Sequence, residues 1–243
     1  MKKICFIPDY DNSTGRGHLG RCINLSKTFK INNWKTFFFN ENKSKATEIN
    51  QEVSFLKKIT NYYFDLIFID SYKLNKKKIN YYKQYTKKIC IIDDYGIIKF
   101  KTDFYINYSC LIPKNPNKYR GIVKLLGLNY LILRPDAKKN NLIKKINLQK
   151  NFIITIFYSA LSSYKLIKST LDSLEKSKFY KKMKIKIIIL NEMKVNRNQI
   201  LILRKIKNVK LIFNPKKIDY FYRSSYFFIG SYGYSFIERL VFK

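Results

Sequence analysis

Short runs of apolar residues recur along the chain and alternate with segments in which apolar residues repeat at helical spacing. Several of these runs are continuously apolar, which is typical of strands buried on both faces of a parallel sheet. The runs that predict strands are residues 4–8, 36–39, 66–70, 89–93, 104–107, 152–157, 185–190, 209–213 and 226–229. Helical patterns fit between them, for example at residues 166–176 and 198–206. This alternation predicts an α/β fold.

The segment 135–150 interrupts the alternation, because it is rich in lysine and asparagine and has little periodicity. A new predicted strand begins directly after it. We therefore expect two Rossmann-like domains, residues 1–135 and residues 151–243, joined by a linker at residues 136–150. Ligands of parallel sheets bind at the carboxyl ends of the strands, and with two domains they bind in the cleft between them.

A loop with three glycines follows the first predicted strand and holds the only histidine of the chain, His18. Behind it, Cys22, Leu25 and Phe29 repeat at helical spacing, so His18 lies at the entrance to a helix. Glycines let a ligand approach the backbone, and a helix N-terminus attracts anions. An imidazole is well suited to move protons near neutral pH. The alternative is a loop histidine that only hydrogen-bonds the backbone.

Polar side chains follow the predicted strands of the first half, where a parallel sheet gathers its carboxyl ends on one rim. They are Asp9, Asp11, Asp70, Ser71, Tyr72, Asp93, Asp94, Tyr95 and Asn107. Taken alone, Ser71 and Asp94 are more simply explained as helix caps, because Ser and Asp favour that position. Several polar strand ends beside a glycine–histidine loop nevertheless indicate a functional site. We expect His18 to be exposed there, in one cleft with Asp9, Tyr72 and Asp94.

A second glycine-bearing loop, at residues 230–235, lies between the last predicted strand and a helical stretch at residues 236–242. Such a loop at a helix N-terminus is a plausible cradle for a diphosphate. Glu238, one turn into the helix, is placed to accept hydrogen bonds from a ribose. It is equally well placed to complement the helix dipole, and both explanations stay open.

The chain is strongly basic, with 49 Lys and Arg against 16 Asp and Glu and a formal net charge of +33. Only 8 of the basic residues are arginine, whose planar fork matches phosphate, and the lysines are scattered. The joint abundance of Lys, Asn, Ile, Tyr and Phe is typical of an AT-rich genome. We therefore expect no specific nucleic-acid partner. The charge favours a general attraction to anionic substrates and a weak association with an anionic membrane surface.

The four cysteines, Cys5, Cys22, Cys90 and Cys110, are far apart in the sequence and form no pair with metal-ligand spacing. Two of them lie inside apolar runs, which predicts buried free thiols and a reducing cytoplasm. We expect no metal site. No signal peptide is visible, and no apolar run approaches the ~20 residues of a membrane span.

The motifs of the first half, in this order and spacing, resemble the UDP-sugar hydrolases of pseudaminic acid biosynthesis and their relatives in spore-coat polysaccharide synthesis. The matching residues cover most of the segment 1–135. They are Gly15-x-Gly17-His18-Leu19-x-Arg21, Asp70-Ser71-Tyr72, Asp93-Asp94, Asn107 and Leu126-Gly127-x-x-Tyr130-x-x-Leu133-Arg134. In the second half the resemblance is confined to residues 230–238.

The resemblance implies a GT-B architecture, in which two Rossmann-like domains hold the active site between them. It implies hydrolysis of UDP-2,4-diacetamido-2,4,6-trideoxy-β-L-altropyranose to UDP and the free sugar, without a metal or another cofactor. It also implies that His18 is the general base for the water that attacks the anomeric carbon. By the same resemblance, the sugar would contact Asp9, Gly17, Arg21, Tyr72, Asp94, Asn107 and Arg134. The nucleotide would contact Gly230, Ser231, Gly233, Tyr234 and Glu238.

The chain departs from the family pattern at three places. Ile7 stands where the family has an arginine, and residues 158–161 replace a glycine-rich turn. The sequence also stops at Lys243, before a strand and an Asn-Gln segment that the family has, so we expect a truncated second domain. Two alternatives stay open. One is a GT-B glycosyltransferase, which would activate an acceptor hydroxyl instead of water, and the other is a non-catalytic nucleotide-sugar-binding remnant.

Overall fold

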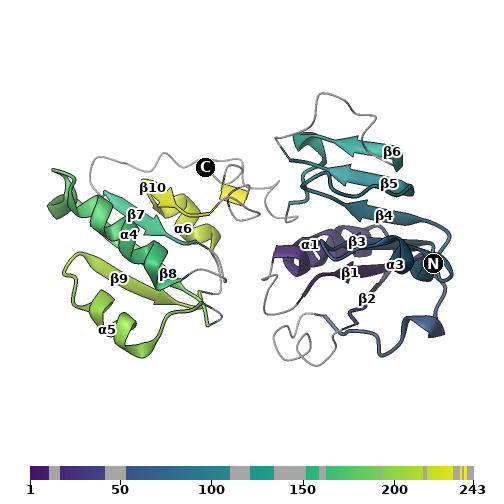
Figure 1. Ribbon diagram of the computed structural model, residues 1–243, viewed down its shortest axis with the longest axis horizontal. Helices are drawn as coiled ribbons and strands as arrows, with labels where there is room; N and C mark the ends of the chain where they lie inside the picture. Colours follow the sequence, from purple (N-terminus) through teal and green to yellow (C-terminus); the bar gives the residue numbers. More distant parts are fainter. Residues whose placement is uncertain are drawn as a thin grey trace. The chain divides into compact units, whose positions relative to one another are not determined.

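The computed structural model divides the chain into two compact units, Met1–Pro135 and Asp136–Lys243, which we call unit 1 and unit 2 (Figure 1). The residues it describes are 1–10, 17–41, 53–109, 121–133, 152–158, 163–191, 193–215, 218–231, 236 and 238–239. The predicted linker at residues 136–150 lies outside them.

Unit 1 is built on a six-stranded sheet in which all neighbouring strands are parallel. Its strands are β1 (Lys3–Pro8), β2 (Lys35–Phe38), β3 (Leu66–Asp70), β4 (Ile89–Ile92), β5 (Thr102–Asn107) and β6 (Gly121–Leu126). Their order across the sheet is β2-β1-β3-β4-β5-β6, so the strand order reverses between β1 and β3. Doubly wound sheets bind ligands at such a reversal, outside the carboxyl ends of the strands.

Two helices cover opposite faces of this sheet. Helix α1 (Gly17–Ile31) packs on the face that carries Phe6, whose ring centroid lies 6.0 Å from that of Phe29. Helix α3 (Lys76–Lys83) packs into the buried cluster that contains Ile7. Since consecutive side chains of a strand point to opposite faces, the two helices sandwich β1. The short 3-10 helices η1 (Ile59–Asn61) and η3 (Leu128–Tyr130) complete the described elements of the unit.

Unit 2 has a four-stranded parallel sheet with the order β10-β7-β8-β9. Its strands are β7 (Ile153–Ile156), β8 (Lys184–Ile189), β9 (Val209–Phe213) and β10 (Phe227–Ile229). Its helices are α4 (Tyr164–Glu175), α5 (Arg197–Arg204), α6 (Asp219–Ser224) and the 3-10 helix η5 (Tyr180–Lys182). Helix α5 begins with a capping box, in which Asn196 and Gln199 each accept a hydrogen bond from the other's backbone N–H.

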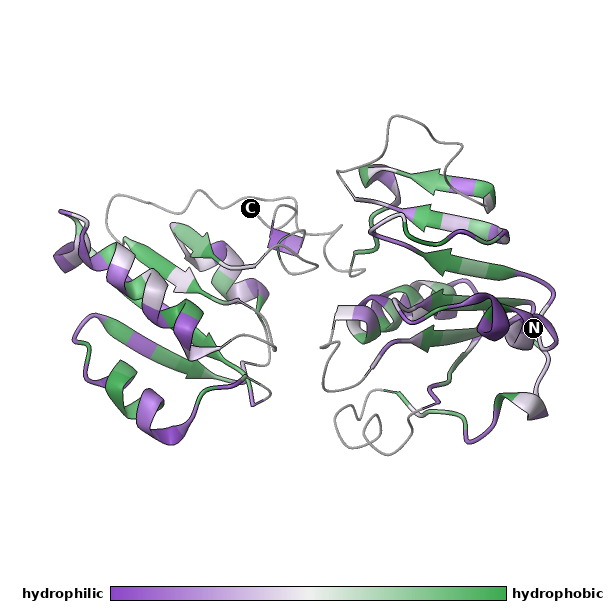
Figure 2. Ribbon diagram, viewed as in Figure 1, coloured by the Kyte–Doolittle hydropathy of each residue, from purple (hydrophilic) through white to green (hydrophobic). Residues whose placement is uncertain are grey.

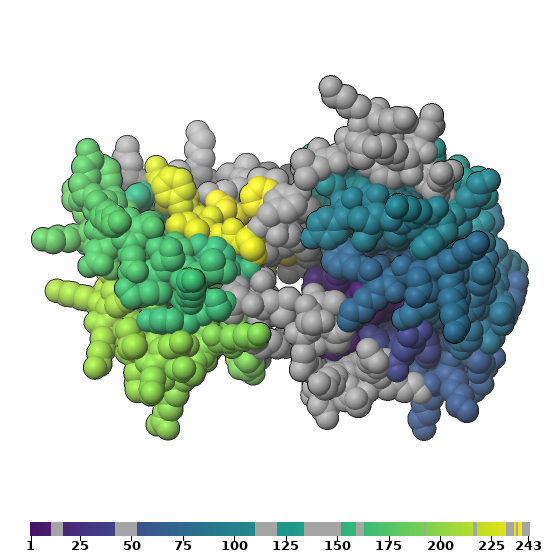
Figure 3. Space-filling model, in the orientation of Figure 1, coloured from purple at the N-terminus to yellow at the C-terminus, as the bar shows by residue number. Residues whose placement is uncertain are grey.

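The core of each unit follows from the apolar runs in the sequence. The strands of both sheets are coloured as hydrophobic along most of their length, whereas the helices contain many hydrophilic residues (Figure 2). Ile154, Ile185 and Ile187 pack with Ile167 of α4 and Leu203 of α5, so these two helices share one face of the unit 2 sheet. In the space-filling view, side chains fill the spaces between the ribbons within each unit (Figure 3).

The predicted α/β class and the predicted parallel sheets are confirmed in both units. The nine predicted strands are present, each with boundaries within two residues of the prediction. Strand β6 was not predicted. It forms an edge of the sheet, and Ile122 and Val123 are 78% and 41% exposed. An edge strand needs no continuous apolar run, because one of its sides has no neighbouring strand.

Among the described residues, no helix combines the length and the apolar character that crossing a membrane requires.

Candidate active site

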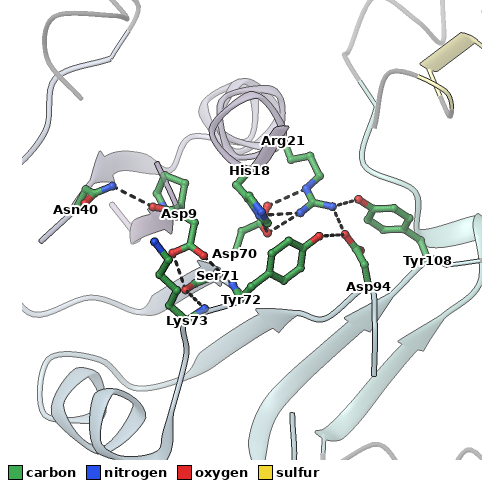
Figure 4. A network of polar contacts seen from close by, with 11 residues as sticks. Asp9, His18, Arg21, Asn40, Asp70, Ser71, Tyr72, Lys73, Asp94 and Tyr108 are labelled. Carbon is green, nitrogen blue, oxygen red and sulfur yellow. Dashed lines mark hydrogen bonds and ion pairs between the residues drawn. The ribbon is translucent and has the colours of Figure 1, made fainter. Parts of the chain in front are cut away.

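The carboxyl ends of β1, β3 and β4 carry a connected network of polar side chains beside the N-terminus of α1 (Figure 4). Asp9 follows β1, Asp70 ends β3, and Asp94 lies two residues beyond β4. His18 and Arg21 reach the network from the first turn and a half of α1. The parallel topology explains the assembly, because it places these strand ends on one rim at the reversal point of the sheet.

His18 is held by Asp70. Its Nδ1 lies 2.6 Å from Oδ1 of Asp70, and both side chains are buried. A charged carboxylate can only accept hydrogen bonds, so Nδ1 carries the proton that is shared with it. The polar contacts of His18 with the described residues all involve Nδ1, and of these only the one to Asp70 is a hydrogen bond, because a protonated Nδ1 and Nη2 of Arg21 are both donors. In the neutral ring, Nε2 is therefore the unprotonated nitrogen, which is the one that can take a proton from a ligand or a water.

Arg21 joins the two carboxylates of the network. Its Nε donates to Oδ2 of Asp70 at 2.8 Å and its Nη2 donates to Oδ1 at 2.7 Å, which is the bidentate geometry of a strong ion pair. Its Nη1 donates to Oδ2 of Asp94 at 2.5 Å and also to the hydroxyl of Tyr108. Arg21 is only 4% exposed, so the charge of its guanidinium is balanced by these neighbours rather than by water.

Asp70 and Arg21 each stabilise the charged form of the other. Burial alone would raise the pKa of Asp70, but the positive charge of Arg21 and the hydrogen bond from His18 outweigh it and hold that pKa below its ordinary value. Burial alone would likewise lower the pKa of Arg21, and the charge of Asp70 raises it well above the ordinary value. Asp70 is therefore a carboxylate, which stabilises a positive charge when His18 takes up a proton.

We expect the stability of unit 1 to fall on acidification below about pH 4. Because the pKa of Asp70 is lowered on folding, the unfolded chain binds that proton more readily than the folded chain. This contribution is complete above the pKa of an unfolded aspartate, about 3.9, and is lost as the pH falls through the lower pKa of the folded state. Trp34, the only tryptophan, lies in unit 1, so its fluorescence during urea unfolding measures the effect. An unfolding midpoint that stays constant down to about pH 2 would contradict a charged Asp70.

Tyr72 covers the imidazole. Its ring meets that of His18 edge to face at a centroid distance of 4.4 Å, and its hydroxyl donates to Oδ2 of Asp94 at 3.4 Å. Partial burial and the charge of Asp94 raise the pKa of Tyr72, so its hydroxyl is a neutral hydrogen-bond donor. Its backbone N–H donates to Oδ2 of Asp9 at 2.8 Å. The side chain is 39% exposed and forms an accessible edge of the site.

Asp9 and Ser71 fix the turn that carries Tyr72. The hydroxyl of Ser71 donates to Oδ1 of Asp9 at 2.7 Å and accepts from the backbone N–H of Lys73 at 3.1 Å. The helix cap of this region is Asn75, which accepts from the backbone of α3, so Ser71 is a turn residue and not a cap. Asp94 is not a cap either, because its carboxylate accepts hydrogen bonds from the side chains of Arg21 and Tyr72.

The structure corrects the expectation that His18 is exposed. It lies on the second residue of α1 and is 4% exposed, because its hydrogen bond to Asp70 draws the ring inward and Tyr72 lies against it. The alternative of a loop histidine bonded only to backbone is also wrong, since its partners are side chains. Gly17, directly before it, is exposed, and a Cβ added there would meet no atom within 4 Å.

Asn107 occupies a structural position. It is 1% exposed, its side-chain oxygen accepts from the backbone N–H of Ser109 at 2.8 Å, and its carbonyl accepts from Gly127 at 2.8 Å. These contacts fasten the end of β5 to the residues after β6. Arg134, which the sequence places in the sugar site, lies outside the described residues.

Two residues that contact Arg21 were not among the predicted site residues. Asp70 was predicted as a polar strand end and as part of the Asp70-Ser71-Tyr72 motif, without a role of its own, although it contacts both His18 and Arg21. Its position in the Asp-Ser-Tyr sequence after an apolar run was the available signal. Tyr108 is 2% exposed and binds Arg21, and nothing in its local sequence separates it from a core tyrosine. Tyr108 reaches Arg21 because it directly follows β5, which lies next to β4 in the sheet.

In unit 2, the described part of the predicted nucleotide loop comprises Gly230 and Ser231, whereas Gly233 and Tyr234 lie outside it. A Cβ at Gly230 would lie 2.2 Å from the carbonyl oxygen of Phe157, so close packing against the end of β7 requires glycine here. The hydroxyl of Ser231 donates to the carbonyl of Tyr158. These contacts explain both residues without a ligand.

We expect Gly230→Ala to destabilise unit 2 by about 1–3 kcal/mol, the usual effect of forcing extra atoms into close packing. The clash is with a backbone oxygen of Phe157, which cannot move aside like a side chain. Thermal unfolding followed by near-ultraviolet circular dichroism measures the change. Trp34 fluorescence serves as the control, because it reports on unit 1. Unchanged unfolding of unit 2 would mean that the backbone at Gly230 has room that the structure does not show.

A cavity of about 270 Å³ adjoins this loop. It is lined by Phe228, Ile229, Gly230, Ser231, Phe236 and Arg239. The Arg239 guanidinium carbon lies 5.1 Å from the centroid of the Phe228 ring, and burial lowers the pKa of this arginine. Glu238 lies next to it in a helical, partly exposed position.

The described residues contain no group of three or more His, Cys, Asp or Glu side chains that could hold a metal ion. Cys5, Cys22 and Cys90 are buried free thiols, as expected, and burial raises the pKa of each. They are therefore poor nucleophiles at neutral pH.

Neither models of known protein families nor curated protein sequences match the chain.

Proposed function

We propose that this chain hydrolyses a UDP-activated amino sugar of the diacetamido-trideoxy class, releasing UDP and the free sugar for nonulosonic acid or surface-polysaccharide synthesis. The observation that carries the proposal is the His18–Asp70 pair, with its 2.6 Å contact, at the reversal point of the unit 1 sheet. This point is where doubly wound sheets bind their ligands, and a carboxylate-held imidazole is a common general base.

In the proposed mechanism, Nε2 of His18 takes a proton from a water molecule as the water oxygen attacks the anomeric carbon. The bond between that carbon and the diphosphate oxygen breaks, and its electron pair leaves with UDP. The resulting imidazolium is stabilised by the charge of Asp70 and then releases its proton to solvent. Gly17 supports this route, because among the described residues no atom lies within 4 Å of the position that its Cβ would occupy.

The proposal includes the GT-B arrangement, with a cleft between the two units and the nucleotide held by unit 2. The diphosphate would contact the loop Gly230–Tyr234, and Glu238 would meet the nucleoside. The cavity beside Gly230 supports a ligand there, although the contacts of Gly230 and Ser231 have a structural explanation of their own. The buried free thiols support a reducing, cytoplasmic setting for the reaction.

The proposal is tested by incubating the full chain with a panel of UDP- and CMP-sugars and measuring the release of nucleotide. We expect release from a UDP-linked N-acetylated deoxy sugar without an added acceptor or metal. Release that requires an acceptor sugar would instead identify a glycosyltransferase. Binding of UDP-sugars without any release would identify a non-catalytic binding protein.

A further inference from the structure

Tyr95 is an exposed aromatic residue at the edge of the site that the proposed mechanism does not use. It follows Asp94 in the turn after β4 and is 71% exposed. Its ring centroid lies 5.0 Å from that of Tyr72, with the ring planes tilted by 48°. Tyr72 in turn contacts His18, so the two tyrosines form a continuous aromatic surface that ends at the imidazole.

The turn that carries Tyr95 is held in place by Asp93. The two side-chain oxygens of Asp93 accept from the backbone N–H groups of Ile97 at 3.2 Å and Ile98 at 2.7 Å. The Tyr105 hydroxyl donates to the same carboxylate at 2.7 Å. Gly96 has a φ of 67°, a conformation that glycine adopts without strain, and it completes the turn. The backbone of Tyr95 is therefore ordered before any ligand arrives, which reduces the entropy lost on binding.

We propose that Tyr95 and Tyr72 form a platform that binds the C–H face of the substrate's pyranose ring and positions it beside His18. This inference rests on the proposed function. The face of an aromatic ring carries a partial negative charge and attracts the weakly positive hydrogens on the apolar face of a sugar. The contact also removes apolar surface of both groups from water, which is favourable. Tyr95 acts as a positioning and specificity residue, because the proposed mechanism assigns every proton transfer to His18 and none to Tyr95.

The charges around the platform favour the sugar over the nucleotide. Asp70 and Asp94 share the single guanidinium of Arg21, which leaves this part of the site negative by one charge. This net negative charge repels a diphosphate. Sugar hydroxyl and amide N–H groups, in contrast, can donate hydrogen bonds to a carboxylate. Oδ1 of Asp94 is a buried carboxylate oxygen that has no hydrogen-bond partner among the described residues.

The test uses methyl N-acetylpyranosides, beginning with that of N-acetylglucosamine, as uncharged probes of the sugar site in the full chain. Saturation-transfer NMR on the wild type is expected to show contact at the ring protons of one sugar face. Tyr95→Ala should weaken binding by about tenfold, and Tyr95→Phe should retain it, because the ring and not the hydroxyl makes the contact. UDP affinity should be the same in all variants. Tyr63, which is 55% exposed and precedes β3 at the opposite end of the strand, provides the control Tyr63→Ala.

The outcomes separate this inference from the proposed function. A wild type that shows no saturation transfer, or a Tyr95→Ala variant that binds as well as Tyr63→Ala does, overturns the platform even if UDP-sugars are hydrolysed. Sugar binding that depends on Tyr95 without any nucleotide release supports the platform and contradicts only the hydrolase proposal. Urea unfolding followed by Trp34 fluorescence checks that both variants keep the stability of the wild type, as expected for exposed side chains.

Discussion

His18→Asn is expected to lower the rate of nucleotide release by about 10²–10⁴-fold, the range typical for loss of a general base. Asparagine keeps an N–H donor for Asp70 and a similar size, but it cannot take up the proton of the attacking water. The rate is measured under substrate saturation, together with the dissociation constant for UDP. That constant should change little, because the nucleotide would contact unit 2.

The control for this variant is its stability. Its unfolding by urea, followed by Trp34 fluorescence, should stay close to that of the wild type, because the contact with Asp70 can be kept. A folded His18→Asn variant that hydrolyses the substrate as fast as the wild type would contradict the mechanism. It would not contradict the fold, and the base would then be sought elsewhere on the same rim.

Asp70→Asn is expected to destabilise unit 1 by about 3–5 kcal/mol, which is typical when one partner of a buried ion pair is removed. Asp70 is fully buried and accepts from His18 and twice from Arg21, so its neutralisation leaves a buried guanidinium without its main counter-charge. For a unit of this size the melting temperature should fall by roughly 10–20 °C. Trp34 fluorescence measures the transition.

Two further variants separate the ion pair from a general effect of losing a carboxylate. Asp65→Asn removes an aspartate whose partner Lys87 is exposed, so it should have a much smaller effect. Combining Asp70→Asn with Arg21→Met should destabilise less than the sum of the two single changes, because neither charge is then left buried alone. Additive effects in the double variant would contradict the coupling of Asp70 with Arg21.

The sequence predicted the strands of both sheets well, because most of them are buried on both faces and are therefore apolar throughout. It missed β6, whose exposed residues at the sheet edge give no such signal. It also placed Asp9, Tyr72, Asp94 and His18 on one rim, since parallel topology requires that strand ends meet. Their pairwise contacts could not be predicted, because they depend on side-chain directions that no local pattern encodes.

Particular residues show where local patterns mislead. Gly230 resembles part of a phosphate-binding loop. Glycine is required there, however, because a Cβ would clash with the carbonyl oxygen of Phe157, 73 residues earlier in the chain. Asn107 lies in a predicted site motif but fastens a turn through Ser109. His18 was expected to be exposed, and its hydrogen bond to Asp70, 52 positions later in the chain, keeps it inside. The partners that decide the roles of Gly230 and His18 are distant in the sequence. The partner of Asn107 is near in the sequence, but no local pattern reveals the contact.

The sequence by itself determined the α/β class, the approximate strand positions and the residue types that gather at the carboxyl rim, because burial and strand ends leave local patterns. Only the tertiary structure decided that Asp70 holds Nδ1 of His18, that Arg21 joins Asp70 to Asp94, and that Tyr108 completes the network. These pairings join residues between 49 and 87 positions apart. They exist because the strand order reverses between β1 and β3 and brings α1 against the ends of β3, β4 and β5.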